Sequence, residues 1–162
     1  MVKITEETII HTKAEDVWNF LTTLQKGDNY KNWHPTDHIK MICLKGNGET
    51  VSSQFYFEEY IGKTILKLSY QITISEKNKY LEYSTIFPLS LLRLGKGSFS
   101  ITPVDINSVK MTAYLEYGYT ITILGDIIDQ IFNLVFKRKS LEKHIHDEGE
   151  NIKKILENKL IY

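Results

Sequence analysis

The sequence predicts one α+β domain, residues 1–162, in which a curved antiparallel sheet of about seven strands wraps around a long C-terminal helix, with two short helices after the first strand. Runs rich in β-forming residues, separated by short turn signals, fill the middle of the chain. A long proline-free stretch with an apolar stripe follows them. The chain has 162 residues, of which 42% are hydrophobic, so it is large enough to bury its own core.

The chain begins with a strand and short helices. Residues 2–12 alternate apolar and polar residues and are rich in β-branched ones, as in a strand. Thr12 and Glu15 have the spacing of a capping box at a helix start. Gly27-Asp28-Asn29 then ends the helical pattern before an irregular stretch from Tyr30 to Pro35. Four apolar residues recur at helical spacing between these signals: Val17, Trp18, Leu21 and Leu24.

The middle of the chain predicts six further strands joined by hairpins. They are expected at residues 39–44, 50–61, 64–74, 80–87, 96–103 and 108–119. Two of these strands show a clear apolar face. The residues that share such a face are Val51, Phe55, Phe57 and Ile61 in one strand and Val109, Met111, Ala113 and Leu115 in the other.

Residues 125–159 contain no proline, and most of this stretch is expected to be one helix. Its apolar stripe needs a partner, and the inner face of the sheet is the only large apolar surface available, which predicts a cavity between the two. The segment 87–92 is expected either to form a hydrophobic loop over the mouth of that cavity or to pack beneath a long connection. The stripe consists of Ile127, Ile131, Leu134, Leu141, Ile145, Ile152 and Leu156.

Composition excludes several classes of protein. Twenty Lys and Arg residues balance twenty Asp and Glu residues, so the basic surface of a nucleic-acid-binding protein is not expected. The single cysteine, Cys43, excludes an intramolecular disulfide and is interpreted as a small buried strand residue. The N-terminus lacks the apolar run of a signal peptide, and no run approaches the roughly 20 residues of a membrane span. A cytoplasmic protein without stable membrane anchoring is therefore expected.

The order of elements, together with the segment Ala14-Glu15-Asp16-Val17-Trp18-Asn19-Phe20-Leu21, resembles the START-like superfamily of helix-grip proteins, also called the polyketide cyclase or SRPBCC superfamily. The resemblance covers nearly the whole chain. It implies a helix-grip fold with a cavity for a small hydrophobic or aromatic molecule. Because the superfamily includes lipid carriers, aromatic cyclases, hydrolases and co-chaperones, it implies much less about function.

Two segments, residues 30–38 and 144–152, resemble motifs of a narrower branch, the diacetylphloroglucinol and phloretin hydrolases. Enzymes of that branch use a zinc ion to cleave the carbon–carbon bond between an aromatic ring and an acyl group. The resemblance implies that His38 is a metal-binding histidine and that Tyr30, eight residues earlier, faces the substrate.

The residues themselves allow a metal site on the C-terminal helix. His144 and Glu148 are four residues apart, so they lie on one flank and offer a nitrogen and an oxygen to the same ion. His146 and Glu150 are the alternative pair, but they are rotated further from the apolar stripe. A solvated contact between histidine and glutamate would explain either pair equally well.

A carboxylate from the sheet is expected to join them. Glu59 has the strand parity of Phe57 and so points inward, whereas Glu58 points outward. An inward carboxylate needs a partner, which can be a metal ion or a hydrogen bond to tyrosine or water. The remaining ligand is His38 or His34. His34 precedes a proline and is held extended, and it is alternatively a substrate-binding group. Two histidines and two carboxylates suit Zn²⁺ or another divalent metal.

Three functions are compatible with these features. The first is binding of a small hydrophobic or phenolic molecule with metal-dependent hydrolysis of an aryl ketone, in which Tyr30 positions the substrate. The second is a non-catalytic carrier or sensor of a hydrophobic ligand. The third is a co-chaperone-like interaction module, which only the charged face of the last helix favours.

Overall fold

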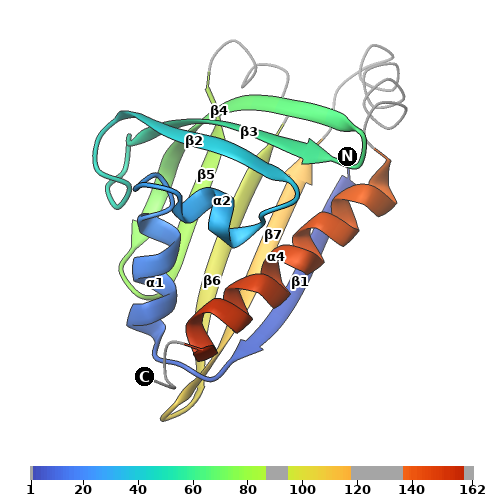
Figure 1. Ribbon diagram of the computed structural model, residues 1–162. Coiled ribbons are helices and arrows are strands. Elements are labelled where there is room, and N and C mark those ends of the chain that lie inside the picture. Colours follow the sequence, from blue (N-terminus) through green and yellow to red (C-terminus); the bar gives the residue numbers. More distant parts are fainter. Residues whose placement is uncertain (1, 87–94, 118–136, 159–162) are drawn as a thin grey trace.

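The computed structural model describes residues 2–86, 95–117 and 137–158, and in these ranges the predicted α+β architecture is confirmed. A seven-stranded antiparallel sheet curves around one long helix, which crosses its concave side (Figure 1). The strands are β1 (Val2–Ile10), β2 (His38–Lys45), β3 (Gln54–Ile61), β4 (Thr64–Glu76), β5 (Tyr80–Thr85), β6 (Lys96–Asp105) and β7 (Ser108–Tyr117). The described helices are α1 (Ala14–Thr22), α2 (Asn29–Trp33) and α4 (Arg138–Asn158).

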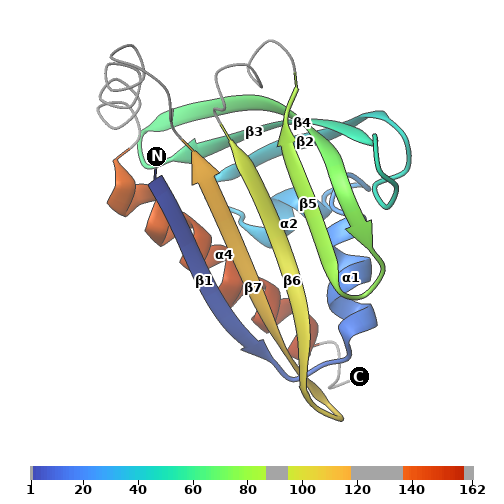
Figure 2. The same cartoon turned by 180° about the vertical axis from the view of Figure 1, so that it is seen from behind.

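The strand order is β1-β7-β6-β5-β4-β3-β2. Strands β2 to β7 therefore lie side by side in the order of the sequence, and β1 lies beside β7. β1 pairs with β7, and the hairpins between β2 and β7 form a meander. Figure 2 shows the convex side of this sheet, with α4 and the short helices behind it. The concave side therefore faces α4, which packs along β1 and reaches α2 and β3.

Three local predictions were wrong. The strand expected at 50–61 begins only at Gln54, because Ser52 has a positive φ of 71° and residues 50–53 form a turn that leaves Val51 52% exposed. The expected irregular stretch after Asn29 begins with the short helix α2. At the start of α1, the Asp16 carboxylate, not Glu15, accepts the hydrogen bond from the Lys13 backbone amide. Thr12 therefore lies one residue before the cap.

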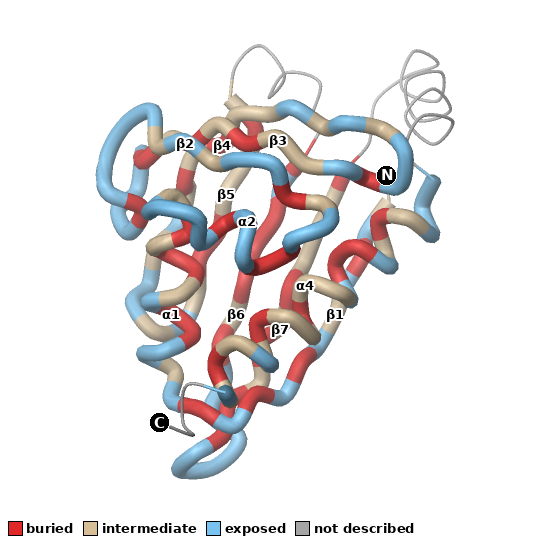
Figure 3. Tube along the Cα trace, viewed as in Figure 1, coloured by how far each residue is buried: buried red, intermediate tan, exposed pale blue. Residues whose placement is uncertain are grey.

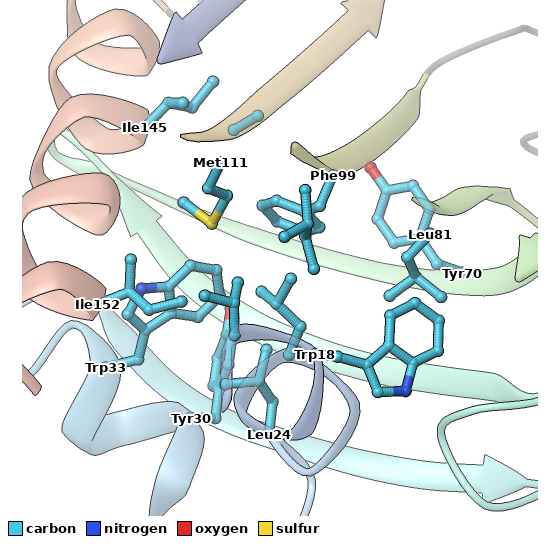
Figure 4. Close-up of a cluster of buried hydrophobic side chains, with 14 of the residues drawn as sticks. Trp18, Leu24, Tyr30, Trp33, Tyr70, Leu81, Phe99, Met111, Ile145 and Ile152 are labelled. Carbon is cyan, nitrogen blue, oxygen red and sulfur yellow. The ribbon is translucent and has the colours of Figure 1, made fainter. Parts of the chain in front are cut away.

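The core lies between the sheet and the helices, as Figure 3 shows in the burial of their facing sides. The part of the predicted stripe that falls on α4 is buried: Leu141, Ile145, Ile152 and Leu156. In Figure 4, Ile145 and Ile152 extend from α4 toward Met111 and Trp33. The expected loop at 87–92 and the stripe residues Ile127, Ile131 and Leu134 lie outside the described residues.

Two features bear on earlier expectations. Within the described part of the chain, no helix has both the length and the apolar character needed to span a membrane. Cys43 is half-buried, and its thiol approaches the carbonyl oxygens of Lys45 and Gly46 at 3.4 Å. The thiol thus has local backbone partners.

Candidate functional site

A cavity of about 150 Å³ lies between α4 and the concave side of the sheet. Its wall is mainly apolar and aromatic, with Phe57, Tyr70, Tyr83 and Phe99 among its residues. Phe57 and Tyr70 stack in parallel with ring centroids 5.2 Å apart, and Tyr83 meets Tyr70 edge to face. Charged groups enter this wall at one place, where Glu59 from β3 meets His144 and Glu148 from α4.

Four side chains predicted as metal ligands converge at that place: His38, Glu59, His144 and Glu148. One ligand atom of each lies within 4.8 Å of the corresponding atoms of the other three. Strand pairing places His38 directly opposite Glu59 at the β2–β3 ladder, and one helical turn brings His144 and Glu148 to the same flank of α4. The fold therefore assembles the group from three separate parts of the chain.

The spacing of these atoms suits one small ion. Nε2 of His38 lies 3.0 Å from Oε1 of Glu148 and 3.7 Å from Oε2 of Glu59. Nε2 of His144 lies 3.6 Å and 3.7 Å from the same two oxygens. Ligands about 2.1 Å from a tetrahedral zinc ion are separated from one another by about 3.4 Å. The four measured separations lie on both sides of that value.

The contacts of His38 direct its Nε2 toward the carboxylate of Glu148. Its Nδ1 lies 2.8 Å from the carbonyl oxygen of Tyr30, which can only accept, so Nδ1 carries the proton. In the neutral ring, Nε2 then carries a lone pair, which faces the Glu148 carboxylate. Two acceptors at 3.0 Å repel each other unless a proton or a metal ion lies between them. A parallel stack on the Tyr30 ring, with centroids 3.9 Å apart, fixes the imidazole plane.

His144 is arranged in the same way. Its Nδ1 lies 3.0 Å from Oδ2 of Asp37, a carboxylate that accepts the Nδ1 proton. Its Nε2 is buried and has no hydrogen-bond partner within the described structure. A buried nitrogen without a partner is costly, and a ligand ion would satisfy it. A carboxylate behind a histidine is also the usual support of a metal-binding imidazole.

The charges of the cluster favour a cation. Burial lowers the pKa of His144, but the carboxylates of Glu148 and Glu59 outweigh burial and raise that pKa to about 10. Burial raises the pKa of Glu59, yet His144 and His38 outweigh it and leave the pKa below its usual value. Without a metal, the raised pKa keeps His144 doubly protonated at neutral pH, so its imidazolium partly balances the two buried carboxylates. A divalent ion would displace the Nε2 proton and neutralise both carboxylates.

Tyr30 contacts a candidate ligand directly. Its hydroxyl donates a 2.5 Å hydrogen bond to Oε2 of Glu59, and its ring also lines the cavity. Burial and then the charge of Glu59 raise its pKa well above the usual value, so the hydroxyl stays protonated. In this structure Tyr30 thus orients Glu59, and the part of it that can meet a ligand is its ring.

His34 lies beside the cluster but has the opposite proton arrangement. Its Nδ1 accepts a hydrogen bond from the backbone amide of Asp37 at 3.3 Å, so the proton of the neutral ring lies on Nε2. That Nε2 is buried, 3.7 Å from Oδ2 of Asp37 and 3.8 Å from Oδ2 of Asp147. Burial and then the charge of His144 lower the pKa of His34. Although His34, Asp37 and His144 also form a close group, this tautomer disfavours His34 as a ligand.

The alternative pair on α4 faces elsewhere. Nδ1 of His146 lies 2.7 Å from Oε1 of Glu6 on β1, and the His146 side chain is 56% exposed.

Glu58 accepts a hydrogen bond from Tyr56 and pairs with Lys40, away from the cavity, as strand parity predicts. Glu59 is the inward carboxylate of the two.

Sequence reasoning missed two supporting residues. Asp37 holds His144, and the indole Nε1 of Trp33 donates a 2.9 Å hydrogen bond to the backbone carbonyl of Glu148. Both lie in the segment 30–38 that drew attention to His38. The position of Asp37, directly before a candidate ligand, was the only available signal, because contacts with α4 depend on the tertiary fold.

No protein-family model and no curated protein sequence matches this chain. Solved structures do match it. Norcoclaurine synthase from Thalictrum flavum, a point mutant in complex with a transition-state analogue, gives a TM-score of 0.70 at 13% identity over 97% of this chain and 94% of that one. A START superfamily protein from Mycobacterium smegmatis gives 0.66 at 12% identity over 96% and 97%.

The di-domain ARO/CYC protein BexL from the BE-7585A biosynthetic pathway gives a TM-score of 0.62 at 11% identity. The match covers 94% of this chain and 47% of BexL, so the chain spans about half the length of that protein. Identities this low establish the fold alone. The fold is the helix grip of START-type proteins, a curved antiparallel sheet closed around a C-terminal helix.

Proposed function

We propose that this protein binds a small aromatic ketone in its cavity and hydrolyses it with a divalent metal ion, preferably zinc, held by His38, Glu59, His144 and Glu148. The observation that carries this proposal is the convergence of two histidines and two carboxylates at the cavity wall, with Nδ1 of each histidine held by an acceptor and Nε2 directed at the carboxylates. The START-type fold supports a hydrophobic ligand.

The size of the cavity favours a ligand with one aromatic ring. A dry apolar cavity of about 150 Å³ accommodates benzene, whereas a long acyl chain needs more room. Phe57, Tyr70 and Phe99 supply flat apolar surfaces for a ring. Glu59, His144 and Glu148 then lie where a polar substituent of that ring, such as a carbonyl group, would reach the wall.

The reaction adds water across the bond between ring and acyl carbon. That carbon–carbon bond breaks, the hydroxyl of water joins the acyl carbon to give a carboxylic acid, and the remaining proton goes to the ring carbon. With four protein ligands, a bound zinc ion would need a fifth coordination position to polarise a carbonyl and to make hydroxide available at neutral pH. Tyr30 keeps Glu59 in place, Asp37 keeps the proton of His144 on Nδ1, and the apolar wall limits the access of bulk water.

Metal content and turnover test this proposal together. Protein purified without a nickel column is analysed for bound metal and then incubated, metal-free or zinc-loaded, with a panel of monocyclic acylphenols. We expect about one zinc ion per chain and release of the deacylated phenol only by the loaded protein. Glu59→Gln serves as the matched control, and it should release none.

A non-catalytic carrier or sensor is the second candidate, because the apolar cavity by itself suffices to bind a ring. Saturable binding of acylphenols without product release, with or without zinc, would favour it. Absence of zinc binding by the intact protein would exclude the metal-dependent hydrolase.

A further inference from the structure

We infer that Gly149 and Thr8 are positioning residues. Their close contact sets the distance of α4 from the sheet and thereby tunes the affinity of the four-residue cluster for a divalent ion. This inference rests on the proposed metal site. It assigns a role in that site to a contact on the opposite flank of the helix.

The contact is unusually close. Gly149 is buried in α4 and lies against Thr8, a buried residue of β1. A Cβ atom added at Gly149 would stand 2.4 Å from Oγ1 of Thr8 and 3.6 Å from its Cβ. Real Cβ atoms essentially never approach within 3.0 Å, so a methyl group would require either rotation of the Thr8 side chain or a movement of α4 from β1 by about 0.6 Å. Thr8 is β-branched, which restricts the rotation. Glycine lowers helix propensity, and its presence in mid-helix indicates a packing requirement.

The distance of α4 from the sheet determines how far the ligand atoms on the helix lie from those on the sheet. His144 and Glu148 lie on α4, whereas His38 and Glu59 lie on the sheet, so lifting the helix separates one half of the cluster from the other. Metal–ligand bonds tolerate deviations of about 0.2 Å, which is less than the displacement that a methyl group imposes. The rest of α4 cannot move freely to absorb the displacement, because the Trp33 indole also donates a hydrogen bond to the backbone carbonyl of Glu148.

The test is a steric double-mutant cycle read out as zinc affinity. The zinc Kd is measured by competition with a chromogenic chelator for the wild type, Gly149→Ala, Thr8→Ala, Thr8→Ala/Gly149→Ala and Thr8→Val/Gly149→Ala. The visible spectrum of the cobalt-loaded proteins reports coordination geometry separately. Lys139→Ala, an exposed change on the same helix, controls for helix propensity.

We expect Gly149→Ala to raise the zinc Kd by at least about tenfold, in the range seen when supporting partners of ligands are lost, and to weaken the tetrahedral cobalt spectrum. Removing the hydroxyl should restore affinity in Thr8→Ala/Gly149→Ala to within threefold of Thr8→Ala. Thr8→Val/Gly149→Ala replaces the obstructing oxygen with a methyl group of similar size and should keep the weakened affinity. Circular dichroism and the melting temperature identify any variant that fails to fold, and the rescue then decides the question.

Three results would overturn the inference. If Gly149→Ala binds zinc as tightly as the wild type, the contact between Gly149 and Thr8 does not control the site, although the proposed metal site stands. If Thr8→Val rescues as well as Thr8→Ala, the obstruction is not steric. A wild type that binds no zinc overturns the proposed function and this inference with it.

Discussion

Glu59 on β3 and Glu82 on β5 are carboxylates of nearly equal exposure, 12% and 10% of their side chains, on opposite faces of the same sheet. Glu82 faces away from the cavity and receives hydrogen bonds from Thr73 at 2.8 Å and Tyr80 at 3.1 Å, with the Lys96 ammonium at 2.8 Å. Its network is complete. Among the described residues, Glu59 has one hydrogen-bond donor, Tyr30, while the nearest nitrogens of His38 and His144 lie 3.7 Å away.

This difference separates a structural charge from one prepared for a ligand. Buried carboxylates need partners, and Glu82 finds all of its partners in the sheet. Around Glu59, a second carboxylate and the Nε2 atoms of two imidazoles are gathered, and the protonated His144 supplies a positive charge that a metal ion would replace. We therefore expect changes at Glu59 to alter metal binding and changes at Glu82 to alter stability.

The largest expected effect tests that contrast directly. Glu59→Gln keeps the shape of the side chain and its contact with Tyr30 but removes an anionic ligand, so the zinc affinity should fall by more than the roughly 10–100-fold that loss of a supporting partner causes. Chelator competition measures the Kd. Glu82→Gln should bind zinc like the wild type. Equal losses in both variants would mean that general destabilisation, not ligation, controls binding.

Thermal stability should reveal the same contrast. At a free zinc concentration of about 100 times Kd, binding to the folded state contributes about 2.7 kcal/mol, which corresponds to a rise of about 5–10 °C in Tm for a chain of this size. Differential scanning calorimetry of metal-free and zinc-loaded protein measures it. Glu82→Gln should keep the rise and Glu59→Gln should lose it. A rise that persists in Glu59→Gln would point to zinc binding elsewhere on the chain.

A smaller effect is expected behind His144. Asp37→Asn removes the charge that holds the Nδ1 proton, and zinc affinity should fall about 10–100-fold. Asp147→Asn is the matched control, because Asp147 pairs with Lys143 and, within the described structure, makes no hydrogen bond to a candidate ligand. If both variants lose affinity equally, long-range charge rather than the Asp37 contact would account for the loss.

The sequence predicted which face of a strand or helix a residue occupies better than it predicted which residues contact one another in the fold. Strand parity placed Glu59 inward and Glu58 outward, and helical spacing placed His144 beside Glu148, because both patterns depend only on neighbouring residues. The choice of His38 over His34 depended on a family resemblance. The two histidines differ in the group that faces Nδ1, which is a backbone carbonyl for His38 and a backbone amide for His34. The contacts of Asp37 and Gly149 depend on the approach of α4, which no local pattern encodes.

The smallest expected effect concerns Glu82 and pH. Burial alone would raise its pKa, but hydrogen bonds from Lys96, Thr73 and Tyr80 lower it below the usual value of 4.5. Because the pKa is lower in the folded state, the charged carboxylate stabilises the fold above pH 4.5, and this contribution is lost as the pH falls through the folded-state pKa. The Lys96 side chain is half exposed, so solvent screening limits the contribution to at most about 1 kcal/mol.

Urea denaturation of metal-free protein across a pH series measures this contribution as the difference in unfolding free energy between the wild type and Glu82→Gln. The difference should shrink on acidification below pH 4.5, and Lys96→Met should reduce it already at neutral pH. A difference that does not change with pH would mean that the charge of Glu82 contributes nothing. The network around Glu82 would then contribute through hydrogen bonding and packing alone. The contrast with Glu59 would rest on the 3.7 Å distances from Glu59 to its neighbouring imidazole nitrogens, and not on the Lys96 charge beside Glu82.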